Sequence, residues 1–270
     1  MRLIIATLIT TICFTSLSYG KTKDFKNKHV EKIVLTSGLQ EQLLNQEEVI
    51  EGMFTMMNGQ QKVDPAMSNI RKDLQNIWIK EFDANELLKK VKKDFHKNLN
   101  EKSLKRVSGF YDIELIKKVS NIEKLASTKE AQQAFMTWTK SLTPTPLNPK
   151  RVQAITNLYT SLSMFELNRD LVYRLFDGIS KSFKDNSFNK DPEKKKAFLN
   201  AYYNQLNQYA VLFGYYVYQG LSDQEFNKYV SLTVNNSDIV KFYASSTKSV
   251  SDYYSEYVKR VATEAYTMIK

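Results

Sequence analysis

The chain has 270 residues, of which 39 are Lys or Arg and 29 are Asp or Glu, giving a formal net charge of +10. Its single cysteine, Cys13, and its two histidines, His29 and His96, are too few for a disulfide framework or a histidine-based metal cage. Its eight glycines form no phosphate-binding loop, and neither Gly-x-Ser-x-Gly nor His-Glu-x-x-His occurs. We therefore expect no metal, no cofactor and no motif-based catalysis.

Residues 1–20 have the pattern of a secretory signal. Arg2 gives the positive start, an apolar run follows from Leu3 to Phe14, and Ser18-Tyr19-Gly20 is a small-x-small cleavage site. The apolar run is too short to span a bilayer comfortably, and no later segment approaches the required length. The sequence thus predicts an exported chain without a transmembrane segment, periplasmic in a Gram-negative bacterium and otherwise secreted. Cleavage after Gly20 would remove Arg2 and leave a formal charge of +9. Residues 21–28 are predicted to form a mobile leader.

Apolar residues at helical spacing predict a first helical unit over 29–140. Two helices are expected before residue 58, separated by a stop at Ser37-Gly38, and Pro65 suits the first turn of the next helix. After a break near Asp83, another helix is expected up to Leu99. From Ile113 onward, the pattern predicts one long closing helix or a helix pair.

The helix before Leu99 carries the densest charge in the chain. Its apolar residues fall on one face, and four lysines fall on the other: Lys89, Lys90, Lys93 and Lys97. The segment 89–106 has a formal charge of +6. This face is a candidate contact for an anionic partner, and the alternative is an ordinary solvated helix face. Nucleic acid is not expected as the partner, because Phe95 and Phe110 lie on apolar stripes and not among the lysines.

Two stretches, 99–108 and 221–230, share one plan of helix-start signals. Asn100 and Ser222 are capping residues, each followed by an acid, and Ser222 with Glu225 also has capping-box spacing. Between the two stretches, the segment 141–150 contains three of the five prolines and predicts a linker.

The second predicted unit, 151–270, begins with a helix pair and a polar loop over 185–192. An uninterrupted helix follows to Tyr218, and its segment 209–218 is apolar nearly all round, which predicts a central, buried helix. A last helix starts near residues 235–237 and runs to the terminus. Tyrosines are concentrated in this unit, and the candidates for lining a ligand cavity are Tyr202, Tyr209 and Tyr216, with core packing as the alternative.

No strand signal occurs, so we predict an all-α helical bundle, made of two similar helical units in tandem. A single bundle with an accidental similarity between helix starts is the alternative.

The chain also resembles the bacterial exported proteins of domain-of-unknown-function family 2059. The resemblance lies in the signal peptide, in the segment Val30-x-x-Ile33-Val34-Leu35-x-Ser37-Gly38-Leu39, and in the Leu-polar-acid-x-x-apolar pattern at 99–104 followed by Phe110-Tyr111. The second unit shares the capped stretch but has no sequence equivalent of Ser37-Gly38. The resemblance implies an exported helical bundle, and it brings no catalytic residues.

Three hypotheses for function follow from the sequence. The first is a non-catalytic envelope protein that binds an anionic polymer, a lipid surface or a protein partner. The second is a carrier with a tyrosine-lined cavity for a small apolar or amphipathic ligand. The third is an envelope hydrolase with dispersed acids such as Glu81 and Asp83.

Overall fold

A computed structural model describes residues 25–46, 65–142, 147–182 and 191–269. Regular structure in these ranges is helical, without strands, which confirms the predicted all-α bundle. The predicted signal 1–20, residues 21–24 of the predicted leader and residues 143–146 of the predicted linker lie outside these ranges, whereas the rest of the leader, 25–28, belongs to the first described helix. The helices are α2 (Phe25–Thr36), α3 (Leu39–Leu44), α5 (Pro65–Glu81), α6 (Ala84–Asn98), α7 (Glu101–Phe110), α8 (Glu114–Ala126), α9 (Lys129–Ser141), α10 (Pro149–Ser161), α11 (Met164–Ser182), α12 (Pro192–Val217), the 3-10 turn η3 (Tyr218–Gly220), α13 (Asp223–Val234) and α14 (Ser237–Ile269).

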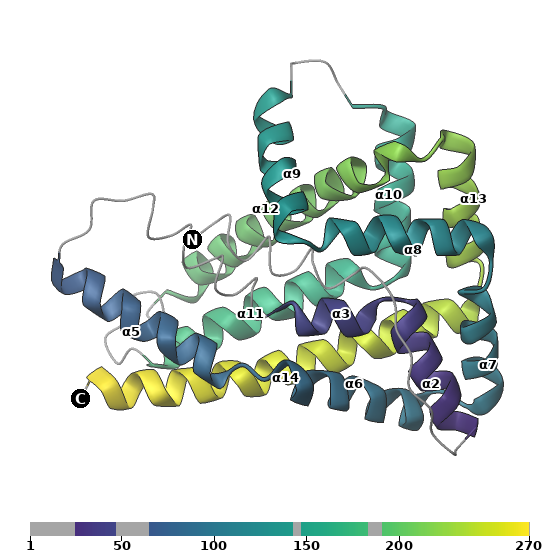
Figure 1. Ribbon diagram of the computed structural model, residues 1–270. Helices are drawn as coiled ribbons and strands as arrows, with labels where there is room; N and C mark the ends of the chain where they lie inside the picture. The colour runs from purple at the N-terminus through teal and green to yellow at the C-terminus, as the bar shows by residue number, and fades with distance from the viewer. Residues whose placement is uncertain (1–24, 47–64, 143–146, 183–190, 270) are drawn as a thin grey trace.

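Helix α14 occupies the centre of the contact network. It packs against α5, α6 and α7 from the first predicted unit and against α11 and α13 from the second. In Figure 1, α14 runs along the lower layer beside α5, α6 and α11, whereas α8, α9, α10, α12 and α13 make up the upper part. Tyr253, Tyr254 and Tyr257 of α14 are among the largest fully buried side chains. The buried apolar residues of both predicted units therefore form one cluster.

The segment 209–218 of α12 and η3 was the predicted central helix. As the apolar pattern indicated, none of its residues is exposed. Its helix α12, however, contacts mainly α10 and α11 and more weakly α8, while α14 contacts helices of both units. The prediction is right about burial and wrong about position, because a hydroxyl-rich helix such as α14 gives a weaker apolar signal than α12.

The helices of the two predicted units contact one another in the same order. In the first unit α2 contacts α3, α6 and α7, and α3 contacts α6; in the second α10 contacts α11, α12 and α13, and α11 contacts α12. The closing helices also contact the other unit, since α14 packs on α5, α6 and α7 as well as on α11 and α13 of its own unit, while α8 contacts α12 and α13. These contacts support the tandem repeat, which stays a prediction, and they show that the closing helices join the two predicted units, which the sequence did not indicate.

The turn between α2 and α3 recurs between α10 and α11. Gly38 has a φ of 75° and Ser163 a φ of 57°, both in the left-handed region. The Gly38 N–H donates to the Leu35 carbonyl, and the Ser163 N–H donates in the same way to the Thr160 carbonyl. The second unit thus has a backbone equivalent of this turn, although it lacks the glycine. The absence of a Ser-Gly pair from the second sequence therefore does not exclude the turn, because serine can adopt the left-handed conformation at a cost of about 1–2 kcal/mol.

The repeated helix starts are confirmed as caps. The Asn100 side chain accepts a hydrogen bond from the Ser103 N–H at 2.8 Å. Ser222 and Glu225 form the full capping box, in which Ser222 Oγ accepts from the Glu225 N–H and the Glu225 carboxylate accepts from the Ser222 N–H. After the first cap, the closing element is the helix pair α8 and α9, divided at Ser127.

Candidate functional site

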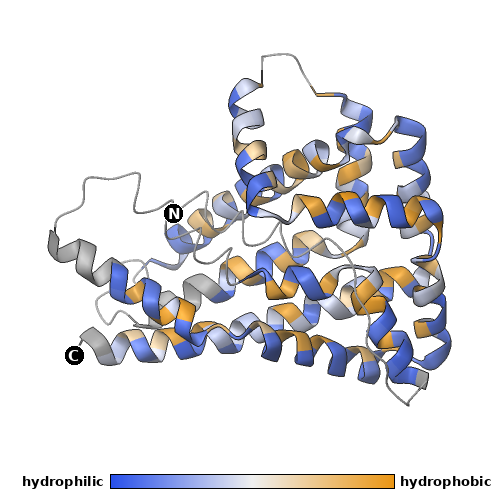
Figure 2. Ribbon diagram, in the orientation of Figure 1, coloured by the Kyte–Doolittle hydropathy of each residue, from blue (hydrophilic) through white to orange (hydrophobic). Residues whose placement is uncertain are grey.

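Helix α6 turns its apolar side to the bundle. Asp83 caps its start with a carboxylate oxygen that accepts two backbone N–H bonds, at 2.8 and 3.0 Å. The apolar pattern predicts a core face of Leu88, Val91, Phe95 and Leu99. In the structure Leu87, Val91 and Phe95 are fully buried, whereas Leu88 is only partly buried, so Leu87 takes the place of Leu88 on this face. Figure 2 shows hydrophilic and hydrophobic residues alternating along α6 and α7, as expected for amphipathic helices at a surface.

The four lysines predicted as a contact lie on the outer part of α6, but they are not equivalent. Lys89, Lys93 and Lys97 are exposed. Within the described ranges, none of these three has a carboxylate within 4.0 Å. Lys90 is partly buried, and its Nζ lies 3.6 Å from the carboxylate of Asp94 one turn later. Three of the four predicted residues therefore carry uncompensated positive charge.

More positive charge lies where α6 ends, beside α2 and the start of α7. His29 of α2 is partly buried, and burial lowers its pKa. The ammonium groups of Lys32, Lys105 and Lys28 lower this pKa further, against an opposing charge on Glu101.

We refer to the five exposed lysines of α6 and α7 that have no carboxylate within 4.0 Å among the described residues as the basic surface: Lys89, Lys93, Lys97, Lys102 and Lys105.

The tyrosines predicted as cavity lining lie on α12 against other aromatic rings. Tyr209 and Tyr216 both contact Phe135 of α9, with ring centroids 5.1 and 5.4 Å apart. Tyr202 stacks on Phe198 at 6.2 Å. Edge and offset contacts of this kind are typical of core packing. They favour the packing interpretation over cavity lining, and the carrier hypothesis stays a prediction.

A small cavity lies between the α2–α3 turn, the end of α7 and α14. Its lining is mainly apolar and also includes the polar residues Ser37, Gln42, Tyr111 and Tyr243. Its volume is about 20 Å³. A cavity of this size has room for about one water molecule, so it is too small for the lipid, peptide or sugar that a carrier would hold.

Glu123 of α8 is a carboxyl group buried between elements of the two predicted units. It is 3% exposed, and its Oε1 accepts hydrogen bonds from Tyr218 Oη at 2.8 Å and from Tyr229 Oη at 2.9 Å. Burial raises its pKa to about 8, although the two hydrogen bonds act in the opposite direction. At neutral pH the group is therefore mostly a neutral acid that ties α8 to η3 and α13.

Two further tyrosines lie close to this acid. The hydroxyls of Tyr111 and Tyr243 are 3.4 Å apart, and burial raises the pKa of both. The negative charge that Glu123 would carry when ionised raises them further. These hydroxyls therefore stay protonated and serve as hydrogen-bonding groups of the core.

Sequence reasoning missed Glu123. The available signal was its register, because Ile116, Val119 and Ser120 are buried on the same side of α8 and Glu123 follows at helical spacing. An acid at a core position of an amphipathic helix predicts a buried, hydrogen-bonded carboxyl. The identity of its tyrosine partners, which are 95 and 106 residues away, has no local signal.

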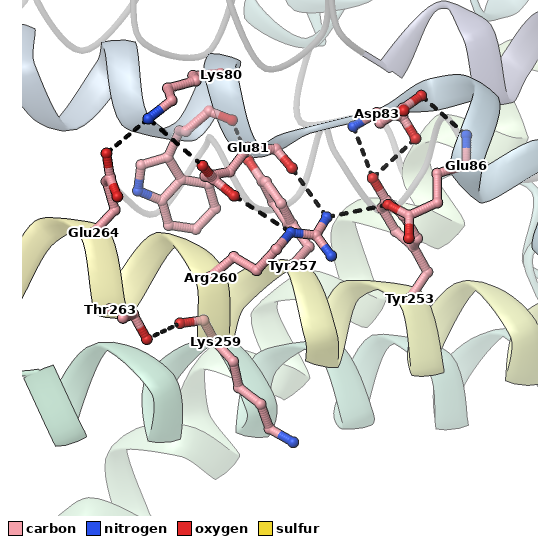
Figure 3. A network of polar contacts seen from close by, with 11 residues as sticks. Lys80, Glu81, Asp83, Glu86, Tyr253, Tyr257, Lys259, Arg260, Thr263 and Glu264 are labelled. Carbon is pink, nitrogen blue, oxygen red and sulfur yellow. Dashed lines mark hydrogen bonds and ion pairs between the residues drawn. The ribbon is translucent and has the colours of Figure 1, made fainter.

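The acids considered for hydrolysis have structural partners. Glu81 contacts Arg260 of α14 at 3.4 Å, and Arg260 also reaches Glu86. The Tyr253 hydroxyl both donates to the Asp83 carbonyl and accepts from the Asp83 N–H. Figure 3 shows the hydrogen bonds and ion pairs by which these groups connect the α5–α6 junction to α14. The Glu81 carboxylate is thus ion-paired and the Asp83 carboxylate caps α6, so both acids have structural roles, which are favoured over an acid/base pair.

No family model matches the chain, and no match is found among the curated proteins or the solved structures. The resemblance to family 2059 therefore stays a prediction. In the described ranges, no helix combines the length and hydropathy needed to cross a membrane. The same ranges contain no group of three or more His, Cys, Asp or Glu residues placed to hold a metal ion.

Proposed function

We propose that this chain is an exported, non-catalytic helical protein of the cell envelope that binds an anionic partner through the basic surface. One observation carries the proposal: five exposed lysines on α6 and α7 lie without a carboxylate in reach among the described residues. A helix face that only contacts solvent often carries opposite charges four residues apart, as Lys90 and Asp94 do here. Glu101 lies four residues before Lys105, but among the described residues no carboxylate comes within 4.0 Å of any of the five ammonium groups. Their net positive charge produces a long-range attraction that favours encounter with a polyanion.

The test measures binding of residues 21–270 to anionic vesicles and to cell-wall fragments, from about 0.02 to about 0.5 M salt, where screening becomes strong. We expect binding at low salt that weakens steeply as salt rises. Replacing Lys89, Lys93, Lys97 and Lys102 of the basic surface with Gln should weaken binding at least about tenfold, since each lysine near an anionic surface contributes about 1 kcal/mol.

The matched control replaces four exposed lysines on other helices with Gln: Lys129, Lys150, Lys228 and Lys259. It removes the same formal charge and should change affinity less than about threefold. Absence of binding at low salt, or equal losses in both variants, would show that the basic surface is not a binding site.

A further inference from the structure

Lys89, Lys93 and Lys97 form a single row along α6. Successive members are four residues apart, which places them about 6 Å apart along the axis and close to one side of the helix. The row therefore extends over about 12 Å. Three ammonium groups spaced in this way match a partner whose charges repeat along a line better than they match one compact anion.

The row has no apolar companions that could enter a bilayer. The apolar side of α6 is filled by Leu87, Val91 and Phe95, which are fully buried against the bundle. Large exposed apolar residues among the described side chains lie on other elements, at Ile113, Leu125, Leu142 and Tyr173. A surface helix that binds membranes inserts its apolar face below the head groups. Helix α6 has no such face available, so its contact must be electrostatic.

The second predicted unit shows what covers the equivalent side of α12. Leu221 follows Leu99 by 122 residues, and the same offset relates Lys93 to Tyr215. The Tyr215 ring lies 6.4 Å from that of Trp138 on α9, in a stacked arrangement. The Asn148 N–H also donates to the Tyr215 hydroxyl. At this position a segment of the chain covers α12, whereas Lys93, at the corresponding position of α6, is exposed and positive.

We infer that the partner of the basic surface is a linear polyanion that lies along α6 from Lys89 to Lys97, with singly charged phosphate or carboxylate groups repeating along its length. This inference rests on the proposed function and narrows the partner to a polymer. Lysine suits it, because its ammonium is a flexible point charge that tolerates variable spacing, whereas recognition of a single phosphate favours the bidentate fork of arginine.

The experiment uses residues 21–270 with four probes: linear polyphosphate, poly-glutamate, orthophosphate, and vesicles of phosphatidylglycerol. We expect both polymers to bind, with affinity rising with chain length, and orthophosphate and vesicles to bind at least about tenfold more weakly. The two polymers separate a phosphate source from a carboxylate source. The triple replacement of Lys89, Lys93 and Lys97 with Gln should weaken polymer binding at least about tenfold and lower the salt slope by about two to three.

A matched triple replacement of Lys129, Lys150 and Lys228, which are exposed on three other helices, should change affinity less than about twofold. Vesicle binding without polymer binding would overturn the linear-polyanion inference and leave the proposed function standing. Equal losses in the two triple variants would overturn the assignment to the row. Failure of every probe at low salt would overturn the proposed function as well.

Discussion

At the scale of single residues, Glu123 connects ionisation to stability. Its carboxyl is buried between two tyrosine hydroxyls, and its pKa rises from 4.5 to about 8. Because the unfolded chain releases this proton near pH 4.5, the folded state binds more protons than the unfolded state between these values. The contribution of Glu123 to stability is therefore fully present below pH 4.5 and is lost as pH rises toward 8, at up to about 1.4 kcal/mol per pH unit.

Replacing Glu123 with Gln should remove this dependence. Glutamine has nearly the same shape, it does not ionise, and its carbonyl can still accept from Tyr218 and Tyr229. In urea unfolding at pH 5, 6.5 and 8, we expect the free energy of unfolding of the variant to rise relative to that of the native chain as pH increases. Glu130→Gln, at an exposed position of α9, should show no such trend. Parallel pH profiles for the native chain and Glu123→Gln would contradict the prediction.

Local residue patterns explain which side chains were predictable. Asn100 and Ser222 act within three residues of themselves, so sequence spacing alone identified both caps. The exposure of Lys93 followed from the periodicity of α6. Glu123 and its tyrosine partners were not predictable, because buried polar contacts between distant helices depend on how those helices pack, and periodicity carries no information on packing partners.

At the scale of elements, the α10–α11 turn offers a direct test of the repeated backbone. Ser163 is the one non-glycine residue with positive φ among the described residues, and Gly38 holds the corresponding position between α2 and α3. We expect Ser163→Gly to raise the free energy of unfolding by about 1 kcal/mol, because the left-handed conformation is strained for a side chain with Cβ. Chemical denaturation at constant pH measures this change.

The reciprocal change, Gly38→Ala, should lower the free energy of unfolding by at least about 1 kcal/mol for the same reason. Since Gly38 is buried, steric contacts would add to the loss. A neutral Gly38→Ala together with a destabilising Ser163→Gly would show that the two turns are not equivalent.

Element boundaries were mostly accessible from sequence, and element positions were not. Pro65 begins α5, as predicted for a residue that suits the first helical turn. Pro149 and Pro192, which were assigned to the linker and to the polar loop, begin α10 and α12. The central role of α14 was missed because its buried side includes Ser245, Ser249 and Ser251, which weaken the apolar pattern. Small hydroxyl residues on α14 leave room for α11 and α6 to pack against it. The sequence of α14 alone does not identify these packing partners.

At the scale of the whole molecule, the contacts that α14 and α8 make across the two predicted units should hold these units together without a covalent link. Replacing 143–146 with a protease recognition sequence allows the intact folded chain to be cut between α9 and α10. We expect the cut halves to co-elute in size-exclusion chromatography and to separate only in denaturant, because α14 packs on α6 and α7 while α8 packs on α12 and α13. The uncut variant, with the melting temperature of the native chain, is the control.

Separation of the halves in native buffer, with each half retaining a cooperative thermal transition, would show two independent domains. That result would contradict the single apolar cluster that the buried residues form. Persistent association would instead show that a break in the chain does not divide the core.

The place of α14 in the chain also matters for the order in which the protein is made. Synthesis completes α5, α6 and α7 more than a hundred residues before α14, the helix that covers them. Until α14 has emerged, side chains such as Val91 and Phe95 lack part of their cover, including the contact of Phe95 with Phe242. A nascent chain of this design therefore cannot complete the burial of these side chains until its last helix is available.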